Sequence, residues 1–150
     1  MAIVEINEQA PVVGTGETEI SAPPEVVWDV LTEIDRWPSW NPDVKSTSMD
    51  GGLVEGSEFR WKAGPGTITS VLQHVDPPRS IAWTGKTLGI RAIHVYRLEP
   101  RGERTLVSTE ESYEGLPARL FRGPVQKTLD TALVDGLRYL KDEAERRTPS

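Results

Sequence analysis

Residues 24–42 constrain the fold more than any other stretch, because they predict a short helix followed at once by a corner. Val27, Trp28 and Leu31 fall on one helical face, and Pro24 suits a first turn, where its missing N–H leaves no hydrogen bond unmade. Two later prolines, in a segment that also holds two tryptophans, then end regular structure. An apolar segment of this kind is typical of proteins that close a cavity.

The composition excludes several kinds of partner and site. With no cysteine among 150 residues, the chain has no disulfide and no thiolate ligand. Its formal net charge of -6 disfavours nucleic acid as a partner, because phosphate binding needs clustered Lys and Arg. Arg119, Arg122 and Lys127 do gather near the start of the last helix, where we interpret them as a solvated face. The N-terminus lacks the pattern of a signal peptide, so we expect a cytoplasmic protein without membrane insertion.

Alternating and helical patterns predict an α+β protein with one domain over residues 1–150. We expect a loose arm at 1–11, a first strand at 12–21, and one long amphipathic helix at 117–147 with a kink near Pro124. Turn residues delimit six further strands, at 44–49, 57–62, 68–75, 81–85, 90–98 and 105–113. Short connections make this order an antiparallel meander.

Four segments together resemble the SRPBCC superfamily, and within it the polyketide cyclase/dehydrase-like family. They read APPEVVWDVLTEIDRWPSWNP, ITSVLQHVDPPRSIAW, HVYRLEP and ESYEGL, in the order that these START-like and birch pollen allergen-like proteins have them. The resemblance implies the helix-grip fold: a curved antiparallel sheet of about six or seven strands wrapped around a long C-terminal helix, with two short helices after the first strand. It also implies a binding site between the sheet and the N-terminal half of that helix.

The predicted strands bring one polar group of residues to the interior. Side chains alternate across a strand, so His94 and Tyr96 share a face with Leu98, and Glu111 shares a face with Val107. The two aliphatic residues mark these faces as inward. A buried carboxyl beside an imidazole could act as general acid and base, which makes Glu111, His94 and Tyr96 candidate catalytic residues. The alternative is that these groups hydrogen-bond one another and only satisfy a polar wall.

Aromatic side chains make up much of the predicted ligand site. Trp61 and Trp83 could stack a flat ligand, although packing against the long helix is an equal alternative for Trp61 and the favoured one for Trp83. Trp28 is expected in the core, and Trp37, like Trp40, could be a packing anchor or a gate. The full set of candidate ligand-binding residues is Trp40, Phe59, Trp61, Trp83, His94, Tyr96, Glu111, Tyr113, Leu116, Leu120, Phe121 and Leu129.

Other chemistry has little support in the sequence. Gly14 and Gly16 lack the third glycine of a dinucleotide site. The two histidines, His74 and His94, stand in no metal-binding motif, and no serine occupies a nucleophile elbow. We therefore expect no metal and no cofactor.

Three functions remain. The leading hypothesis is a protein that binds a small hydrophobic, aromatic or lipid-like molecule. The second is a polyketide cyclase or dehydratase that uses the acid/base groups named above. The third is a protein-interaction module, which predicts a filled interior and a large exposed apolar patch. A homodimer is plausible, but no residues locate an interface.

Overall fold

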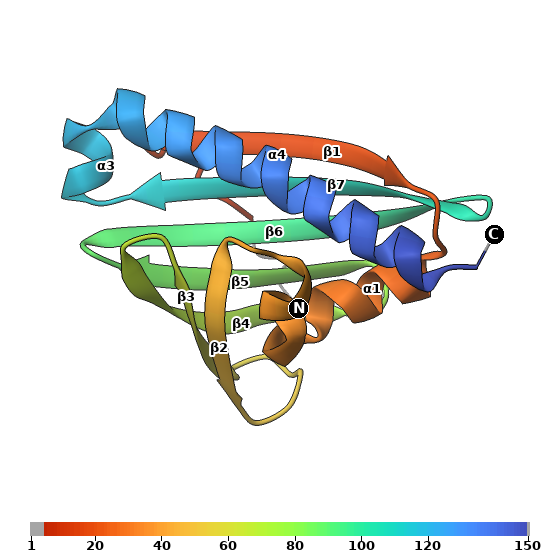
Figure 1. The fold of residues 1–150 in the computed structure, drawn as a ribbon. Coiled ribbons are helices and arrows are strands. Elements are labelled where there is room, and N and C mark those ends of the chain that lie inside the picture. The colour runs from red at the N-terminus through yellow and green to blue at the C-terminus, as the bar shows by residue number, and fades with distance from the viewer. Residues whose placement is uncertain (1–4, 150) are drawn as a thin grey trace.

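The computed structural model describes residues 5–149, and seven antiparallel strands form its single sheet (Figure 1). Their order across the sheet is β1-β7-β6-β5-β4-β3-β2. The strands are β1 (Val12–Ile20), β2 (Val44–Asp50), β3 (Glu58–Ala63), β4 (Gly66–Asp76), β5 (Ser80–Thr87), β6 (Ile90–Arg101) and β7 (Arg104–Glu114). Residues 5–11 of the expected arm form no regular element, and residues 1–4 lie outside the described part.

The helices lie at the two ends of the sheet and across its concave face (Figure 1). After β1 come α1 (Pro24–Thr32), the 3-10 turn η1 (Ile34–Arg36) and α2 (Trp37–Trp40), and after β7 come α3 (Leu116–Leu120) and α4 (Arg122–Arg147). The long helix α4 runs over β1, and its C-terminal end meets α1. The structure therefore has the helix-grip arrangement that the sequence predicts. None of the described helices has both the length and the apolar content to cross a membrane.

The C-terminal helical stretch is interrupted at a different residue from the one expected. It divides at Phe121, whose φ of -121° and ψ of 47° lie outside helical values, and the expected kink at Pro124 was wrong. Pro124 lies in the first turn of α4, where the backbone N–H groups have no partners inside the helix. A proline there removes no hydrogen bond and causes no bend.

Two glycines of β1 let α4 lie directly on the sheet. A Cβ atom at Gly14 would lie 2.9 Å from Leu133 Cδ1 and 3.0 Å from Leu129 Cγ. At Gly16 the corresponding atom would lie 3.0 Å from Leu137 Cδ1. All three leucines are buried, as their spacing along the helix predicts. The helix and the first strand are thus in close contact along this line.

The larger core cluster lies between the sheet and the corner segment formed by α1, η1 and α2. Trp28 and Trp37 are both buried there, and the indole Nε1 of Trp37 donates a hydrogen bond to the carbonyl of Leu31 over 2.9 Å. Trp28 is thus a core residue, as expected. Trp37, for which the sequence left two interpretations open, is a packing anchor that holds η1 and α2 against the sheet.

Candidate functional site

Glu111 and His94 lie directly opposite each other on β7 and β6. Their side chains point to the concave face, with His94 Nδ1 3.4 Å from Glu111 Oε1. Only 10% of the histidine side chain and 12% of the glutamate side chain are exposed. The structure therefore brings together the carboxyl and the imidazole that strand alternation predicted as neighbours.

Thr109 completes a hydrogen-bonded chain behind this pair. Its hydroxyl oxygen lies 2.8 Å from His94 Nε2, and the same hydroxyl donates to the carbonyl of Val95 over 3.1 Å. A hydroxyl has one hydrogen, so an oxygen that donates to Val95 must accept from His94. This network assigns the proton of a neutral His94 to Nε2 and leaves the lone pair of Nδ1 facing Glu111.

The facing lone pair indicates which form of Glu111 the site holds. An ionised carboxylate would repel the lone pair of Nδ1, whereas a neutral carboxyl can donate to it. Burial acts in the same direction, because it raises the pKa of the Glu111 carboxyl to about 8 and lowers the pKa of the His94 imidazole to about 3. Near neutral pH both groups are therefore mainly uncharged.

Aromatic rings surround the pair. Tyr96 stacks on His94 with ring centroids 4.6 Å apart, and Trp83 contacts the same imidazole at 5.1 Å. Burial raises the pKa of the Tyr96 and Tyr113 phenols, so both hydroxyls keep their protons. Tyr113 packs on the smaller core cluster of Val12, Ala118, Leu129 and Leu133. The site thus offers hydrogen-bonding groups inside an apolar wall.

The remaining predicted aromatics fill the space beside this wall. Trp37 contacts Phe59, Trp61 and Trp83 with ring centroids 5.5 to 5.7 Å apart. The indole of Trp61 donates to Ser70 Oγ over 3.0 Å. Trp40 packs on the same core, and its buried Nε1 has no partner among the described residues. These rings form a continuous cluster that reaches His94 through Trp83.

The predicted residues of the last helices do not join this cluster. Leu129 is buried against Val12 on the β1 side. Leu116, Leu120 and Phe121 are exposed at the end of the sheet near α3. Their contact with a ligand stays a prediction, whereas the polar pair and its aromatic neighbours form one connected arrangement.

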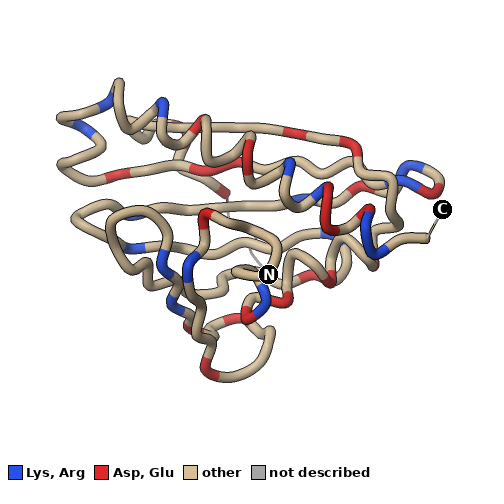
Figure 2. Tube along the Cα trace, viewed as in Figure 1, with Lys and Arg blue, Asp and Glu red and all other residues tan. Residues whose placement is uncertain are grey.

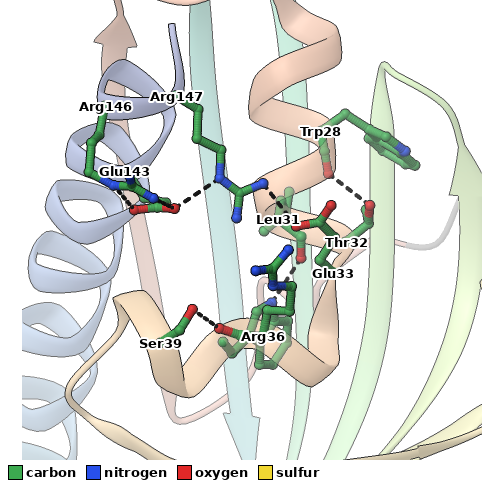
Figure 3. Close-up of polar contacts among 10 residues, drawn as sticks. Trp28, Leu31, Thr32, Glu33, Arg36, Ser39, Glu143, Arg146 and Arg147 are labelled. Carbon is green, nitrogen blue, oxygen red and sulfur yellow. Dashed lines mark hydrogen bonds and ion pairs between the residues drawn. The ribbon is translucent and has the colours of Figure 1, made fainter.

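Two surface hollows lie away from this arrangement. One, of about 320 Å³, is lined by Pro24, Glu25, Pro77, Pro78, Arg79, Leu98 and Pro100. The other, of about 510 Å³, is lined by Arg36, Ser39, Glu143, Arg146 and Arg147 (Figure 3).

In the second hollow the positive charges are largely compensated. Arg146 and Arg147 both bind Glu143, and their hydrogen bonds lower the pKa of its carboxyl to about 2. Arg147 also binds Glu33 over 2.8 Å, which connects the end of α4 to the end of α1 (Figure 3). These ion pairs therefore connect the C-terminal ends of α1 and α4 and have a structural role.

Thr109 is the residue of the site to which the sequence assigned no role. Strand alternation does place it on the inward face with Glu111, but a threonine in a strand is ordinary and carries no chemical signal. Its place in the chain follows only from the register, which sets it opposite Tyr96 and diagonal to His94. A search for polar residues flanking a predicted inward titratable group could have found it.

Comparison with solved structures shows that this architecture is the START/helix-grip fold. A START superfamily protein from Mycobacterium smegmatis superposes with a TM-score of 0.79 at 19% identity, over 91% of this chain and 99% of that one. A hypothetical protein from Helicobacter pylori gives 0.82 at 14% identity, over 96% and 98%. The Zhui aromatase/cyclase from a Streptomyces strain gives 0.78 at 19% identity, over 92% and 96%. At these identities the likeness shows the fold alone.

The family follows from the sequence match. The model described as polyketide cyclase / dehydrase and lipid transport matches residues 12–145, and the chain belongs to that family. No curated protein is significantly similar to the chain in sequence. The family supports a role in binding a ligand or in polyketide cyclisation.

Proposed function

We propose that the protein binds a small hydrophobic molecule on the concave face of its sheet, with a polar group of that molecule at Glu111. The observation that carries this proposal is the nearly buried, uncharged Glu111–His94 pair, set in aromatic side chains and continued by Thr109. Burying polar groups costs stability, and an apolar core would have avoided the cost. A ligand that needs both an apolar wall and a hydrogen bond gives the arrangement a use.

The direction of the hydrogen bonds favours one kind of ligand. When Glu111 donates its proton to His94 Nδ1, its other oxygen can only accept a hydrogen bond. The Tyr113 hydroxyl, which keeps its proton, can donate to an oxygen of the ligand. We therefore infer a hydroxylated aromatic or similar molecule in preference to a plain hydrocarbon.

Tryptophan fluorescence provides the test, because Trp83 contacts His94. We expect 2-naphthol to quench the emission at concentrations about tenfold lower than naphthalene does, the difference made by one hydrogen bond to a buried group. Glu111→Leu should remove this preference. Glu111→Gln should keep it, because the amide can donate an N–H to His94 Nδ1 and still accept at its oxygen. Equal affinity for both probes in the natural chain would contradict the proposal.

A second candidate function is catalysis of cyclisation or dehydration, favoured by the pKa of about 8 at Glu111. A carboxyl with this pKa is partly ionised near neutral pH and can accept a proton from a carbon next to a carbonyl. The acid so formed can return the proton to a neighbouring hydroxyl, which leaves as water while the carbon–carbon double bond forms. Glu111→Gln then keeps binding and loses turnover. Unchanged turnover in that variant would exclude the catalytic role.

A further inference from the structure

Large apolar side chains gather on the outside of the molecule around α3. Leu88, Leu116, Leu120 and Phe121 are 59 to 65% exposed, and only two other large apolar side chains of the described residues, Val54 and Val134, are similarly exposed. We call these four residues the α3 patch. Single exposed apolar residues are common, but a group of four at one end of a domain is not.

The helix α3 exposes its large apolar side chains and buries a small one. Leu116 and Leu120 are four residues apart and share one face, whereas Ala118 on the opposite face is completely buried against Leu129. A helix that served only the core would bury its leucines and expose its smaller residue. Both leucines are thus available to an external partner.

Leu88 is attached to the same end by the turn between β5 and β6. The residue just before α3 touches this turn, because Gly115 lies next to the carbonyl of Gly89. Leu88 has a φ of 49°, a left-handed conformation that asparagine or glycine adopts more easily. A leucine there adopts a strained backbone conformation and exposes an apolar side chain to solvent, so it does not stabilise the fold. This indicates that Leu88 serves an interaction with another molecule.

Unpaired positive charges surround the patch. Five exposed cations lie at this end: Lys86, Arg91, Arg119, Arg122 and Lys127. Within residues 5–149 none of them forms an ion pair, whereas at the opposite end Arg104, Lys141, Arg146 and Arg147 all bind carboxylates. Figure 2 shows basic residues on α3 and on the first turns of α4. This end is basic although the whole chain has a formal net charge of -6.

We propose that the α3 patch docks on the surface of an anionic lipid bilayer. Leucine and phenylalanine side chains can enter the boundary of the acyl chains while arginine and lysine contact anionic headgroups. A second copy of the chain fits less well, because a two-fold contact would place these basic residues against themselves. The acidic remainder of the protein would orient this end toward the membrane.

The patch lies at the end of the sheet closest to Glu111. Glu111 is three residues from the end of β7, about 10 Å along the strand. Docking would therefore bring the proposed ligand site near the bilayer, from which a hydrophobic molecule could enter. The docking itself does not depend on the ligand.

Co-sedimentation with lipid vesicles tests the proposal. We expect the full chain to bind vesicles of phosphatidylcholine with phosphatidylglycerol about tenfold more tightly than vesicles of phosphatidylcholine alone, and added salt to weaken the binding. The pair Leu120→Ser and Phe121→Ser should lower binding about tenfold, and so should the pair Arg119→Gln and Arg122→Gln. Val134→Ser is the matched control, since it removes an equally exposed side chain from the middle of α4.

Circular dichroism on each variant separates loss of binding from loss of fold. Absence of sedimentation with anionic vesicles would overturn the proposal, as would equal binding by both double variants and the natural chain. Size-exclusion chromatography with light scattering is run without lipid. A dimer or larger assembly that the Leu120/Phe121 variant abolishes would assign the patch to a protein contact, and would equally overturn the lipid proposal.

Discussion

At the scale of single residues, the hydroxyl of Thr109 determines how the candidate site is protonated. It accepts from His94 Nε2 and donates to Val95, which turns the lone pair of Nδ1 toward Glu111. No charged group is needed for this control. A residue without acid/base chemistry of its own thus decides which atoms of the pair carry protons.

Replacement of Thr109 tests this assignment. Thr109→Val keeps the shape but leaves the buried Nε2–H of His94 without an acceptor, so we expect a loss of about 1–3 kcal/mol in the free energy of unfolding. Long-range ¹H–¹⁵N spectra should show His94 mainly as the Nε2–H tautomer in the natural chain and as a mixture in this variant. Thr109→Ser keeps the hydroxyl and should retain both the tautomer and the stability. An unchanged tautomer in the valine variant would contradict the assignment.

The pKa values of the pair predict the pH dependence of folding. Glu111 has a pKa of about 8 in the folded chain and 4.5 as its ordinary value, so the folded state holds more protons between these values and stability falls as pH rises. His94 has a pKa of about 3 instead of 6.5, so stability falls as pH drops below 6.5. The two opposing slopes overlap between pH 4.5 and 6.5, where stability is greatest.

Urea unfolding at several pH values measures this dependence. From pH 6.5 to pH 8 we expect the free energy of unfolding of the natural chain to fall by on the order of 2 kcal/mol. In this range Glu111 is protonated in the folded chain and ionised in the unfolded chain, which costs about 1.36 kcal/mol for each pH unit. Glu111→Gln cannot ionise and should be nearly flat over this range. An equal decline in both chains would show that Glu111 is already ionised in the folded state.

At the scale of secondary-structure elements, contact between β1 and α4 requires residues without side chains on the strand. Gly14 faces two buried leucines at distances that a Cβ atom could not keep. Gly14→Ala should therefore lower the free energy of unfolding by about 1–3 kcal/mol, the usual cost of overpacking. Gly136 in the middle of α4 is the matched control, because a Cβ atom there would meet nothing within 4 Å.

The control is expected to move stability in the opposite direction. Gly136→Ala should raise the free energy of unfolding by about 0.5–1 kcal/mol, since alanine favours the helix and restricts the unfolded chain. Thermal or urea unfolding of the two variants measures both effects. If Gly14→Ala were neutral, α4 would not lie as close to β1 as described.

Strand periodicity predicted which residues of the site share a face, but no pattern predicted where the C-terminal helical stretch divides. The two-residue period placed His94, Tyr96 and Glu111 on one inward face, because the hairpin between β6 and β7 fixes their register. The break at Phe121 was not predictable, since it depends on how α3 packs through Ala118. Local sequence patterns contain no information on such distant contacts.

At the scale of the whole molecule, the sequence predicted the fold but not the distribution of apolar residues over it. The resemblance in four segments indicated the helix-grip fold, and the structure and the family match confirmed it. The outward face of α3 was not predicted, because two leucines four residues apart are equally compatible with burial. Only the packed structure shows that Leu116 and Leu120 face away from the core.

The function proposed for the whole molecule depends on one property, which is that a small molecule occupies the concave face next to Glu111. Native mass spectrometry of the full chain, after incubation with a small-molecule extract of its source cells, measures this directly. We predict a discrete additional mass that is lost on denaturation, and that the Glu111→Leu variant retains much less of it. If the natural chain shows only its own mass, or if the natural chain and the Glu111→Leu variant retain the same amount of additional mass, the account is contradicted.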